Sequence, residues 1–178
     1  MASFLGVTKG MRLQPVGEDD LPVLEKLGQD PDAAGEFAWF GWNNLRGLRQ
    51  GWDENGLIGP DGGTLMVVRD KEPVGSVNWR RRRTGPASHC WEMGIVLLPE
   101  ARGHGYGAEA HRLLVRYLFE HTTVHRVEAV TEVGNVAEQR ALEKTGFARE
   151  GVMRGEFWRG GEWRDMVIYS ILRTDPLP

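Results

Sequence analysis

The chain has 178 residues, 40% of them apolar and 26% charged, which suits one packed core of ordinary domain size. Its formal net charge of −3 at pH 7 excludes a globally basic protein that would bind nucleic acid or an anionic membrane through overall charge. Cys90 is the only cysteine, which excludes an intrachain disulfide and zinc sites built from four cysteines.

We therefore expect one domain spanning residues 1–178, with neither nucleic acid nor a membrane as its partner. The segment Met1 to Lys9 lacks the basic start and apolar run of a secretion signal, and no later stretch approaches about 20 apolar residues. These features predict a cytoplasmic protein.

The N-terminal half changes from helical to strand periodicity. After a strand at Met11–Val16, Asp20 is placed to cap a short helix that carries leucines at helical spacing. A second helix is predicted by the apolar stripe from Trp42 to Trp52. Alternating runs separated by turn residues then predict three strands of an antiparallel meander: Leu65–Arg69, Val74–Trp79 and His89–Leu97.

The C-terminal half begins with a helix behind a glycine-rich segment, since apolar residues from Ala110 to Leu118 recur at helical spacing. A strand, a helix closed by Gly146 in a left-handed conformation, and a hairpin across Gly160-Gly161 follow. Their expected bounds are Arg126–Thr131, Val136–Thr145, Val152–Trp158 and Trp163–Leu172. The order βααβββαβαββ predicts an α+β domain on a mixed sheet.

The turn between the third meander strand and the next helix is suited to binding a diphosphate. Gly103, Gly105 and Gly107 alternate there with His104 and Tyr106. Amide N–H groups at a helix N-terminus converge on an anion, the helix dipole favours negative charge, and glycine lets the backbone approach closely. The preceding Arg102 can add a charge-assisted contact.

A dinucleotide is the alternative ligand for this turn. Residues Gly103 to Ala108 also satisfy the G-x-G-x-x-A fingerprint, and Glu128 lies near the distance expected for a ribose-binding acid. Two features oppose an NAD(P)-binding protein: the first glycine follows the strand only after Pro99-Glu100-Ala101, and a meander precedes it instead of alternating βαβ units.

Three stretches resemble the GNAT superfamily of acyl-CoA-dependent N-acyltransferases, within it the branch related to ribosomal-protein N-terminal acetyltransferases (RimJ/RimL-like). Arg102 to Gly107 fits the pattern [Q/R]-x-x-G-x-[G/A]. Asn135 to Phe147 is similar to N-x-A-S-x-R-x-L-E-K-x-G-F, and Gly161 to Leu172 resembles the terminal strand motif of this branch. The likeness covers residues from about Cys90 to Arg173, and the N-terminal half agrees in element order.

The resemblance implies a mixed, mostly antiparallel twisted sheet with splayed central strands and helices on both faces. It implies acetyl-CoA as cofactor, with its diphosphate on the amides of Gly103, His104, Gly105, Tyr106 and Gly107 beside Arg102. The pantetheine arm would pair with the backbone of Ile95, Val96 and Leu97 as an added strand, because a splayed strand offers unpaired N–H and C=O groups. Asn135 would border the same slot, and family analogy implies a homodimer.

Amine acylation needs a base, and Glu92 is our candidate. On the strand before the turn, Trp91, Met93 and Ile95 share an apolar face, so Glu92 lies on the other face, toward the expected cleft. There it could accept a proton from the amine, and partial burial would raise its pKa. A salt-bridged or solvent-facing glutamate is the alternative.

No residue is assigned as the proton donor to the leaving thiolate, and Tyr169 or a water molecule is the alternative left open. The positions where the family carries a serine or tyrosine hold Glu138 and Leu142, and Glu138 also fits an Asn-x-x-Glu capping box with Asn135. A non-catalytic CoA-binding sensor or scaffold module is therefore the second reading of this chain.

Other features receive weaker interpretations. The basic run Arg80–Arg83 is typical of a solvated hairpin tip, and His121 and His125 lack the glutamate of a zinc motif, so no metal site is predicted. Core packing is expected for Trp42. For three other tryptophans the family resemblance implies an aromatic acceptor wall, with core packing as an equal alternative: Trp39, Trp79 and Trp158.

Together these features predict an N-acetyltransferase that moves the acetyl group of acetyl-CoA to a primary amine by direct attack. The acceptor stays open, because resemblance fixes fold better than substrate. A small-molecule amine is favoured slightly over a peptide N-terminus.

Overall fold

The structure, a computed structural model, describes residues 7–8 and 10–176. Within them, nine strands form one sheet in the order β1-β2-β4-β5-β6-β7-β9-β8, with β3 paired to β4 outside this order. The strands are β1 (Val7–Thr8), β2 (Met11–Pro15), β3 (Ile58–Gly59), β4 (Gly62–Arg69), β5 (Glu72–Arg83), β6 (His89–Leu97), β7 (Arg126–Glu132), β8 (Ala148–Arg159) and β9 (Glu162–Leu172).

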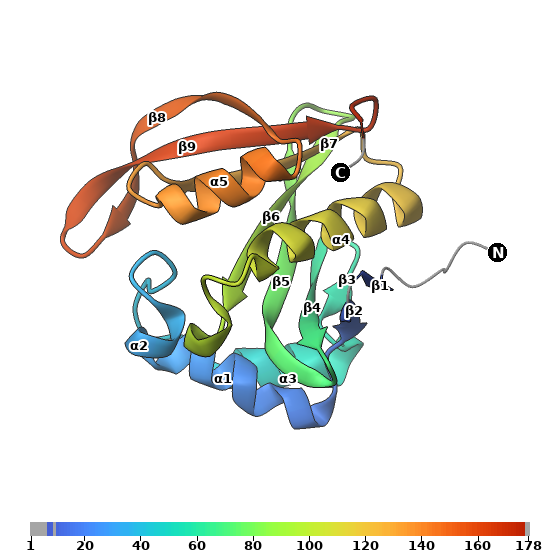
Figure 1. Cartoon of the computed structure of the whole chain (residues 1–178), viewed down its shortest axis with the longest axis vertical. Helices are drawn as coiled ribbons and strands as arrows, with labels where there is room; N and C mark the ends of the chain where they lie inside the picture. Colours follow the sequence, from blue (N-terminus) through green and yellow to red (C-terminus); the bar gives the residue numbers. More distant parts are fainter. Residues whose placement is uncertain (1–6, 9, 177–178) are drawn as a thin grey trace.

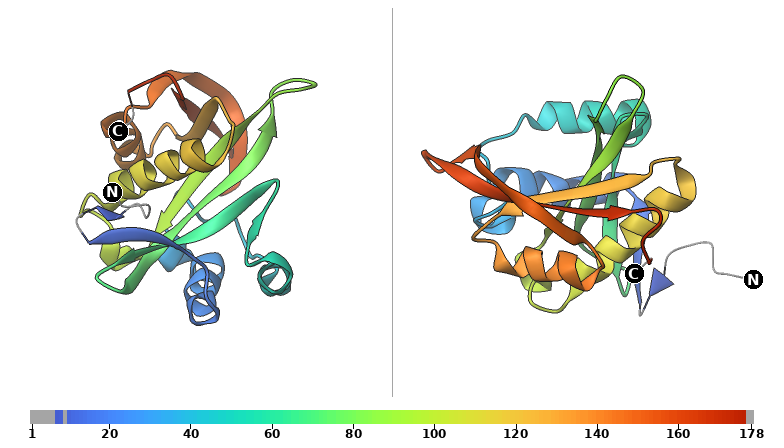
Figure 2. Two further views of the ribbon diagram at one scale, coloured as in Figure 1. Left: turned by 90° about the vertical axis from the view of Figure 1, so that its right-hand side faces the viewer. Right: turned by 90° about the horizontal axis from the view of Figure 1, so that it is seen from above.

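Helices cover both faces of the sheet, as the two views in Figure 2 show. They are α1 (Leu21–Gln29), α2 (Pro31–Ala34), α3 (Leu45–Asn55), α4 (Tyr106–His121) and α5 (Val136–Lys144), with 3-10 turns η1 (Glu18–Asp20) and η2 (Pro99–Ala101). No helix in the described part of the chain is long and apolar enough to cross a membrane.

The main core lies between the sheet and α4. Leu114, Val115 and Leu118 of α4 are fully buried in it, together with Trp91 and Met93 of β6. A smaller cluster packs α1 and α3 against the other face around Met66 and Val68. Burial of these apolar side chains is the main favourable contribution to folding. The predicted alternation of faces along β6 is therefore confirmed at Trp91 and Met93.

The sheet is antiparallel except where β6 and β7 pair in parallel. That pairing joins only Trp91–Met93 to Val127–Ala129, after which the strands separate. In Figure 1 the β7–β9–β8 part of the sheet diverges from the β4–β5–β6 part. The predicted mixed sheet, flanked on both faces and splayed at its centre, is confirmed.

Several boundaries differ from the prediction. Helix α3 begins at Leu45 behind the N-cap Asn44, whose side chain accepts a hydrogen bond from the N–H of Arg46 at 3.0 Å. Trp42 precedes this cap and is 75% exposed, so the core role expected for it is wrong. The hairpin prediction is confirmed, with Gly160 and Gly161 at φ of 61° and 81° between Arg159 and Glu162.

Candidate active site

A cavity of about 580 Å³ opens where β6 and β7 separate. Four segments contribute its walls: the end of β6, the turn before α4, the exposed side of α5, and the chain after α2. The lining residues are Ala34, Gly35, Glu36, Phe37, Ala38, Ile95, Val96, Leu97, Arg102, Gly103, Gly105, Gly107, Ala108, Asn135, Ala137, Glu138, Arg140, Ala141 and Lys144. The cavity therefore unites most of the residues predicted to bind a cofactor.

The turn before α4 presents free backbone donors to this cavity. Gly103 and Gly105 have φ of 79° and 81°, in the left-handed region that glycine adopts without strain. No acceptor within the described residues takes up the N–H groups of Gly103, His104 or Gly105. Helix α4 starts at the next residue and is 16 residues long, so its dipole adds positive potential at the same place. This geometry suits an anion such as a diphosphate.

The side chains of this turn differ in where they lie. His104 and Tyr106 are not among the cavity-lining residues; their rings contact each other at 5.4 Å, and Arg69 lies over Tyr106 at 4.7 Å. Only their backbone N–H groups are therefore placed to contribute to the anion site.

The guanidinium of Arg102 forms hydrogen bonds with backbone carbonyls of two other segments. It donates to the carbonyl of Leu97 at 3.0 Å, to that of Ala34 at 3.0 Å, and also to that of Ala33. These bonds tie the end of β6 and the end of α2 to the turn. The charge-assisted phosphate contact expected of Arg102 is therefore replaced by an organising role, although the residue still lines the cavity.

Two cations that the sequence analysis missed line the cavity. Arg140 and Lys144 are one helical turn apart on α5, facing the turn from across the cavity. Neither has an ion-pair partner among residues 7–8 and 10–176, so both charges are available to an anionic ligand. Their i, i+4 spacing in the helix after Asn135 could have predicted from the sequence that both cations lie on one side of that helix.

The open edge of β6 forms the second wall. Ile95, Val96 and Leu97 pair with β5 on one side, whereas pairing with β7 ended at Met93. Apart from the Leu97 carbonyl, which accepts from Arg102, the backbone groups of this segment that face away from β5 are available to an extended, amide-bearing ligand. Asn135 stands opposite as the N-cap of α5, accepting from the N–H of Glu138 at 3.3 Å and donating to the hydroxyl of Thr131 at 3.0 Å.

Glu92 is engaged in an ion pair. Its Oε1 accepts from Arg80 at 3.1 and 2.5 Å, and its side chain is 17% exposed. It is absent from the cavity lining, two residues before the separated part of β6. The structure thus places Glu92 beside the cleft and realises the salt-bridged alternative; the base role remains a proposal.

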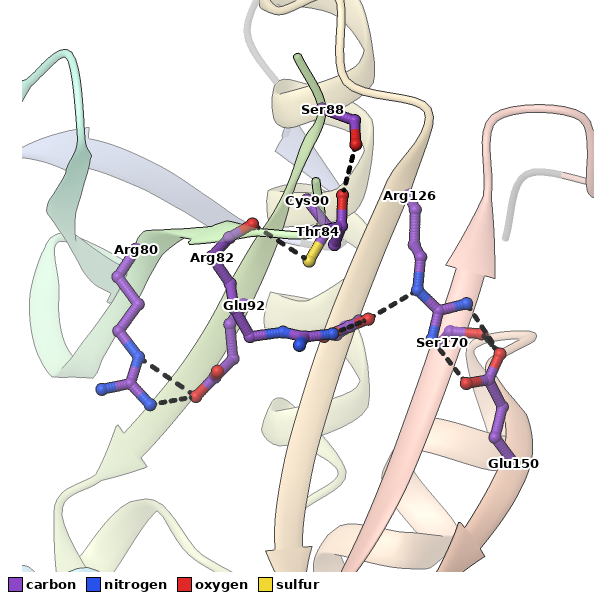
Figure 3. A network of polar contacts seen from close by, with 10 residues as sticks. Arg80, Arg82, Thr84, Ser88, Cys90, Glu92, Arg126, Glu150 and Ser170 are labelled. Carbon is purple, nitrogen blue, oxygen red and sulfur yellow. Dashed lines mark hydrogen bonds and ion pairs between the residues drawn. The ribbon is translucent and has the colours of Figure 1, made fainter. Parts of the chain in front are cut away.

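A second group of ion pairs, centred on the buried Glu128, lies beside the Arg80–Glu92 pair (Figure 3). Arg82 and Arg126 both bond to Glu128, which is 1% exposed, and Arg126 bonds in turn to Glu150. Burial opposes ionisation of Glu128, but the two guanidinium groups outweigh it and hold its pKa below the usual range. Arg126 and the hydroxyl of Ser170 lower the pKa of Glu150 to about 2.

This network decides against the dinucleotide reading. Glu128, the residue expected to hold a ribose, is enclosed by two arginines and does not line the cavity. The same contacts account for part of the basic run: Arg80 and Arg82 neutralise buried or half-buried carboxylates, and Arg81 reaches Asp61 at 3.5 Å.

The predicted acceptor tryptophans separate into two groups. Trp79 is 5% exposed in the main core, with its ring 5.6 Å from that of Tyr117, so its assignment to the acceptor wall is not supported. Trp158 is 56% exposed near the tip of the β8–β9 hairpin and contacts Trp163. Trp39 contacts Trp42 edge-on at 5.2 Å, just after the cavity-lining residues that end at Ala38.

Comparison with known proteins shows which family this chain resembles in sequence. Residues 11–148 match the family described as the acetyltransferase (GNAT) domain. The chain belongs to the GNAT acetyltransferase family. It is 37% identical over 111 residues to a probable N-acetyltransferase, YjcK, of Bacillus subtilis, covering 62% of this chain and 61% of that protein. The expected superfamily is thus confirmed.

More distant GNAT proteins show the same fold. The chain is 27% identical over 123 residues to the ribosomal protein uS5-alanine N-acetyltransferase of Escherichia coli, covering 69% of this chain and 59% of that one. A crystal structure of spermidine N-acetyltransferase from Vibrio cholerae, in complex with CoA and spermine, superposes with a TM-score of 0.78 at 19% identity, covering 94% and 98% of the two chains. The chain spans about half the length of the first curated relatives it matches.

Proposed function

We propose that this GNAT domain binds acetyl-CoA in the cavity and transfers its acetyl group to a primary amine by direct attack. The observation that carries the proposal is one cavity lined by free N–H groups at a helix start, two unpaired cations and an unpaired strand edge. The crystal structure with CoA and spermine is of a protein with the same fold. When bound, acetyl-CoA supplies the reactive thioester.

The residues present fit the parts of CoA. The N–H groups of Gly103 to Gly107 would hold the diphosphate with Arg140 and Lys144, and the open edge of Ile95 to Leu97 would bind the pantetheine amides. A backbone N–H near Ile95 is the proposed donor to the developing oxyanion. Glu92 is the proposed base that removes a proton from the incoming ammonium group.

An acceptor with an apolar body fits the mouth of the cavity. Phe37 lines the cavity, and Phe40 contacts Phe157 of the facing hairpin at 4.9 Å; Figure 1 shows these two segments opposite each other. Trp158 extends this exposed aromatic surface, which exceeds the scattered apolar side chains of an ordinary surface. We therefore favour a small-molecule amine over a peptide N-terminus, with Trp39 and Trp158 among the acceptor-binding residues.

Thiol release from acetyl-CoA tests the activity. The acceptors are spermidine, an alanine-initiated peptide and tryptamine. Turnover is expected with at least one amine, with tryptamine preferred to spermidine, and Glu92→Gln should lower kcat about 100-fold, the usual contribution of a general base. CoA binding without turnover of any amine would instead support the sensor module.

The proposal includes assembly as a homodimer, which the family resemblance implies. Light scattering of the purified chain should give twice the 20.0 kDa mass of one chain. A mass of 20.0 kDa across a wide concentration range would contradict this part of the proposal.

A further inference from the structure

A buried histidine supports one carboxylate of the cavity wall. His111 of α4 is 0% exposed, and its Nε2 lies 2.7 Å from Oε1 of Glu138. Its Nδ1 is buried without a hydrogen-bond partner in the described structure. A proton on Nδ1 would be buried without an acceptor, so the arrangement favours the tautomer whose Nε2–H donates to Glu138.

Glu138 forms part of the cavity wall, and one of its two carboxylate oxygens is bound to His111. Its backbone N–H is fixed by the Asn135 cap, and Oε1 is held by His111, whereas Oε2 has no partner within residues 10–176. Glu138 lines the cavity together with Asn135, the N-cap of α5. The predicted capping box forms only in part, because the N–H of Asn135 donates to the carbonyl of Glu132 and not to Glu138.

Glu138 is the best-placed carboxylate of the cavity for handling a proton. The other cavity carboxylate, Glu36, has a side chain that is 72% exposed, and Glu92, the proposed base, does not line the cavity. A carboxylate held at one oxygen and free at the other can accept a proton and release it without reorganising. A purely structural role would require only that Glu138 accept the hydrogen bond of His111. Such a role would not require Glu138 to line the cavity.

We propose that Glu138 carries a proton from the acceptor nitrogen to the departing sulfur of CoA, with His111 as its positioning residue; this rests on the proposed function. An ammonium acceptor must lose two protons as the C–N bond forms and the C–S bond breaks. Glu92 passes the first to solvent. Glu138 takes the second from nitrogen and gives it to sulfur, because both atoms are bonded to the same carbon during transfer. The products are the amide, CoA thiol and one released proton.

Matched substitutions test the pair. Glu138→Gln keeps the shape and should lower kcat about 100-fold while the Kd for CoA stays within about threefold. His111→Leu removes the donor and should lower kcat about tenfold, since a small displacement of a reacting group is costly. His111→Gln restores an N–H donor and should recover most of that loss. Glu18→Gln, on exposed η1, is the control and should match the unaltered protein.

A second readout does not depend on turnover. In protein labelled with ¹⁵N-histidine, the ring signals of His111, assigned by their loss in His111→Gln, should shift when CoA is added. In Glu138→Gln they should respond weakly, because the link from the cavity to the ring has been altered.

The outcomes separate this inference from the proposed function. Calorimetry showing no CoA binding would overturn the proposed function itself, and this inference with it. CoA binding with normal turnover in Glu138→Gln would overturn the role of Glu138 alone. If CoA binds but no tested amine is acetylated, the ring signals decide: a shift supports contact between Glu138 and the cofactor, and unchanged signals overturn it.

Discussion

Gly103 and Gly105 adopt left-handed backbone conformations at the start of α4, with open space where a Cβ would lie. Their requirement for glycine is therefore conformational and not a matter of crowding. An L-residue in this region costs on the order of 1–2 kcal/mol, and the turn would relax by rotating its N–H groups away from the cavity. The proposed anion site therefore depends on the backbone conformation of these two glycines.

Gly105→Ala should weaken CoA binding about tenfold or more, since about 1.4 kcal/mol corresponds to a factor of ten. Isothermal calorimetry measures the effect. Gly47→Ala is the matched control, because Gly47 lies within α3 with free space around it. That control should leave binding unchanged and slightly raise thermal stability. Equal CoA affinity in Gly105→Ala would contradict the proposed anion site.

The carboxylate of Glu150 makes stability depend on acidic pH. Its pKa in the folded protein is about 2, below the usual 4.5, because Arg126 and Ser170 favour the ionised form. The unfolded chain therefore binds more protons in this window. The resulting stabilisation is complete above about pH 4.5 and is lost as the pH falls toward 2.

The unfolding free energy, measured by urea titration at several pH values between 2 and 5, should accordingly depend less steeply on pH in Glu150→Gln than in the unaltered protein. Glu156→Gln, at an exposed position of β8, serves as control and should keep the steep dependence. Identical slopes for all three proteins would mean that the ion pair with Arg126 contributes nothing to stability.

At the level of elements, helix α5 shows what a cap contributes to the site. Asn135 fixes the first turn of α5 through its Oδ1 and binds the end of β7 through Thr131. That turn carries Glu138, and the following turns carry Arg140 and Lys144. A single cap therefore orients every polar residue that α5 contributes to the cavity.

Asn135→Ala should reduce the unfolding free energy by about 1 kcal/mol, the usual cost of losing a cap. Chemical denaturation measures this, and CoA affinity should fall in parallel because the α5 residues lose their fixed position. Asn135→Ser retains an acceptor for the N–H of Glu138 and should recover most of the stability. Equal losses in both variants would show that the bond to Thr131 matters more than the cap.

Elements with strong periodicity could be predicted from the sequence. The meander, α4, α5 and the closing hairpin follow directly from apolar spacing and glycine turns. The start of α3 was misplaced because Trp42 fits the apolar stripe, whereas Asn44 provides the cap that defines the boundary. Local sequence pattern carries no information on whether an aromatic side chain finds a partner across the molecule. For this reason it did not predict that Trp42 is exposed and Trp79 is buried.

The candidate site was predictable where backbone geometry defines it. The glycine turn and the open edge of β6 lie in one cavity, as expected. The roles of individual side chains were not predictable, because they depend on contacts distant in sequence. Arg102 donates to carbonyls of α2, and Glu92 accepts from Arg80 on the neighbouring strand. Glu138 is hydrogen-bonded to His111 on another helix.

For the whole molecule, the separation of β6 from β7 is the feature that creates the cavity. It places a helix N-terminus, the unpaired cations and a free strand edge around one space of about 580 Å³. Exposed aromatic residues lie on two segments, the loop after α2 and the β8–β9 hairpin, which contact each other through Phe40 and Phe157.

The most direct test is isothermal calorimetry of the full chain with CoA and, separately, with NAD and NADP. We expect one CoA bound per chain, an affinity that falls with rising salt and falls further when Arg140 and Lys144 are both replaced by glutamine, and no binding of either dinucleotide. Binding of NAD or NADP in place of CoA would contradict the account.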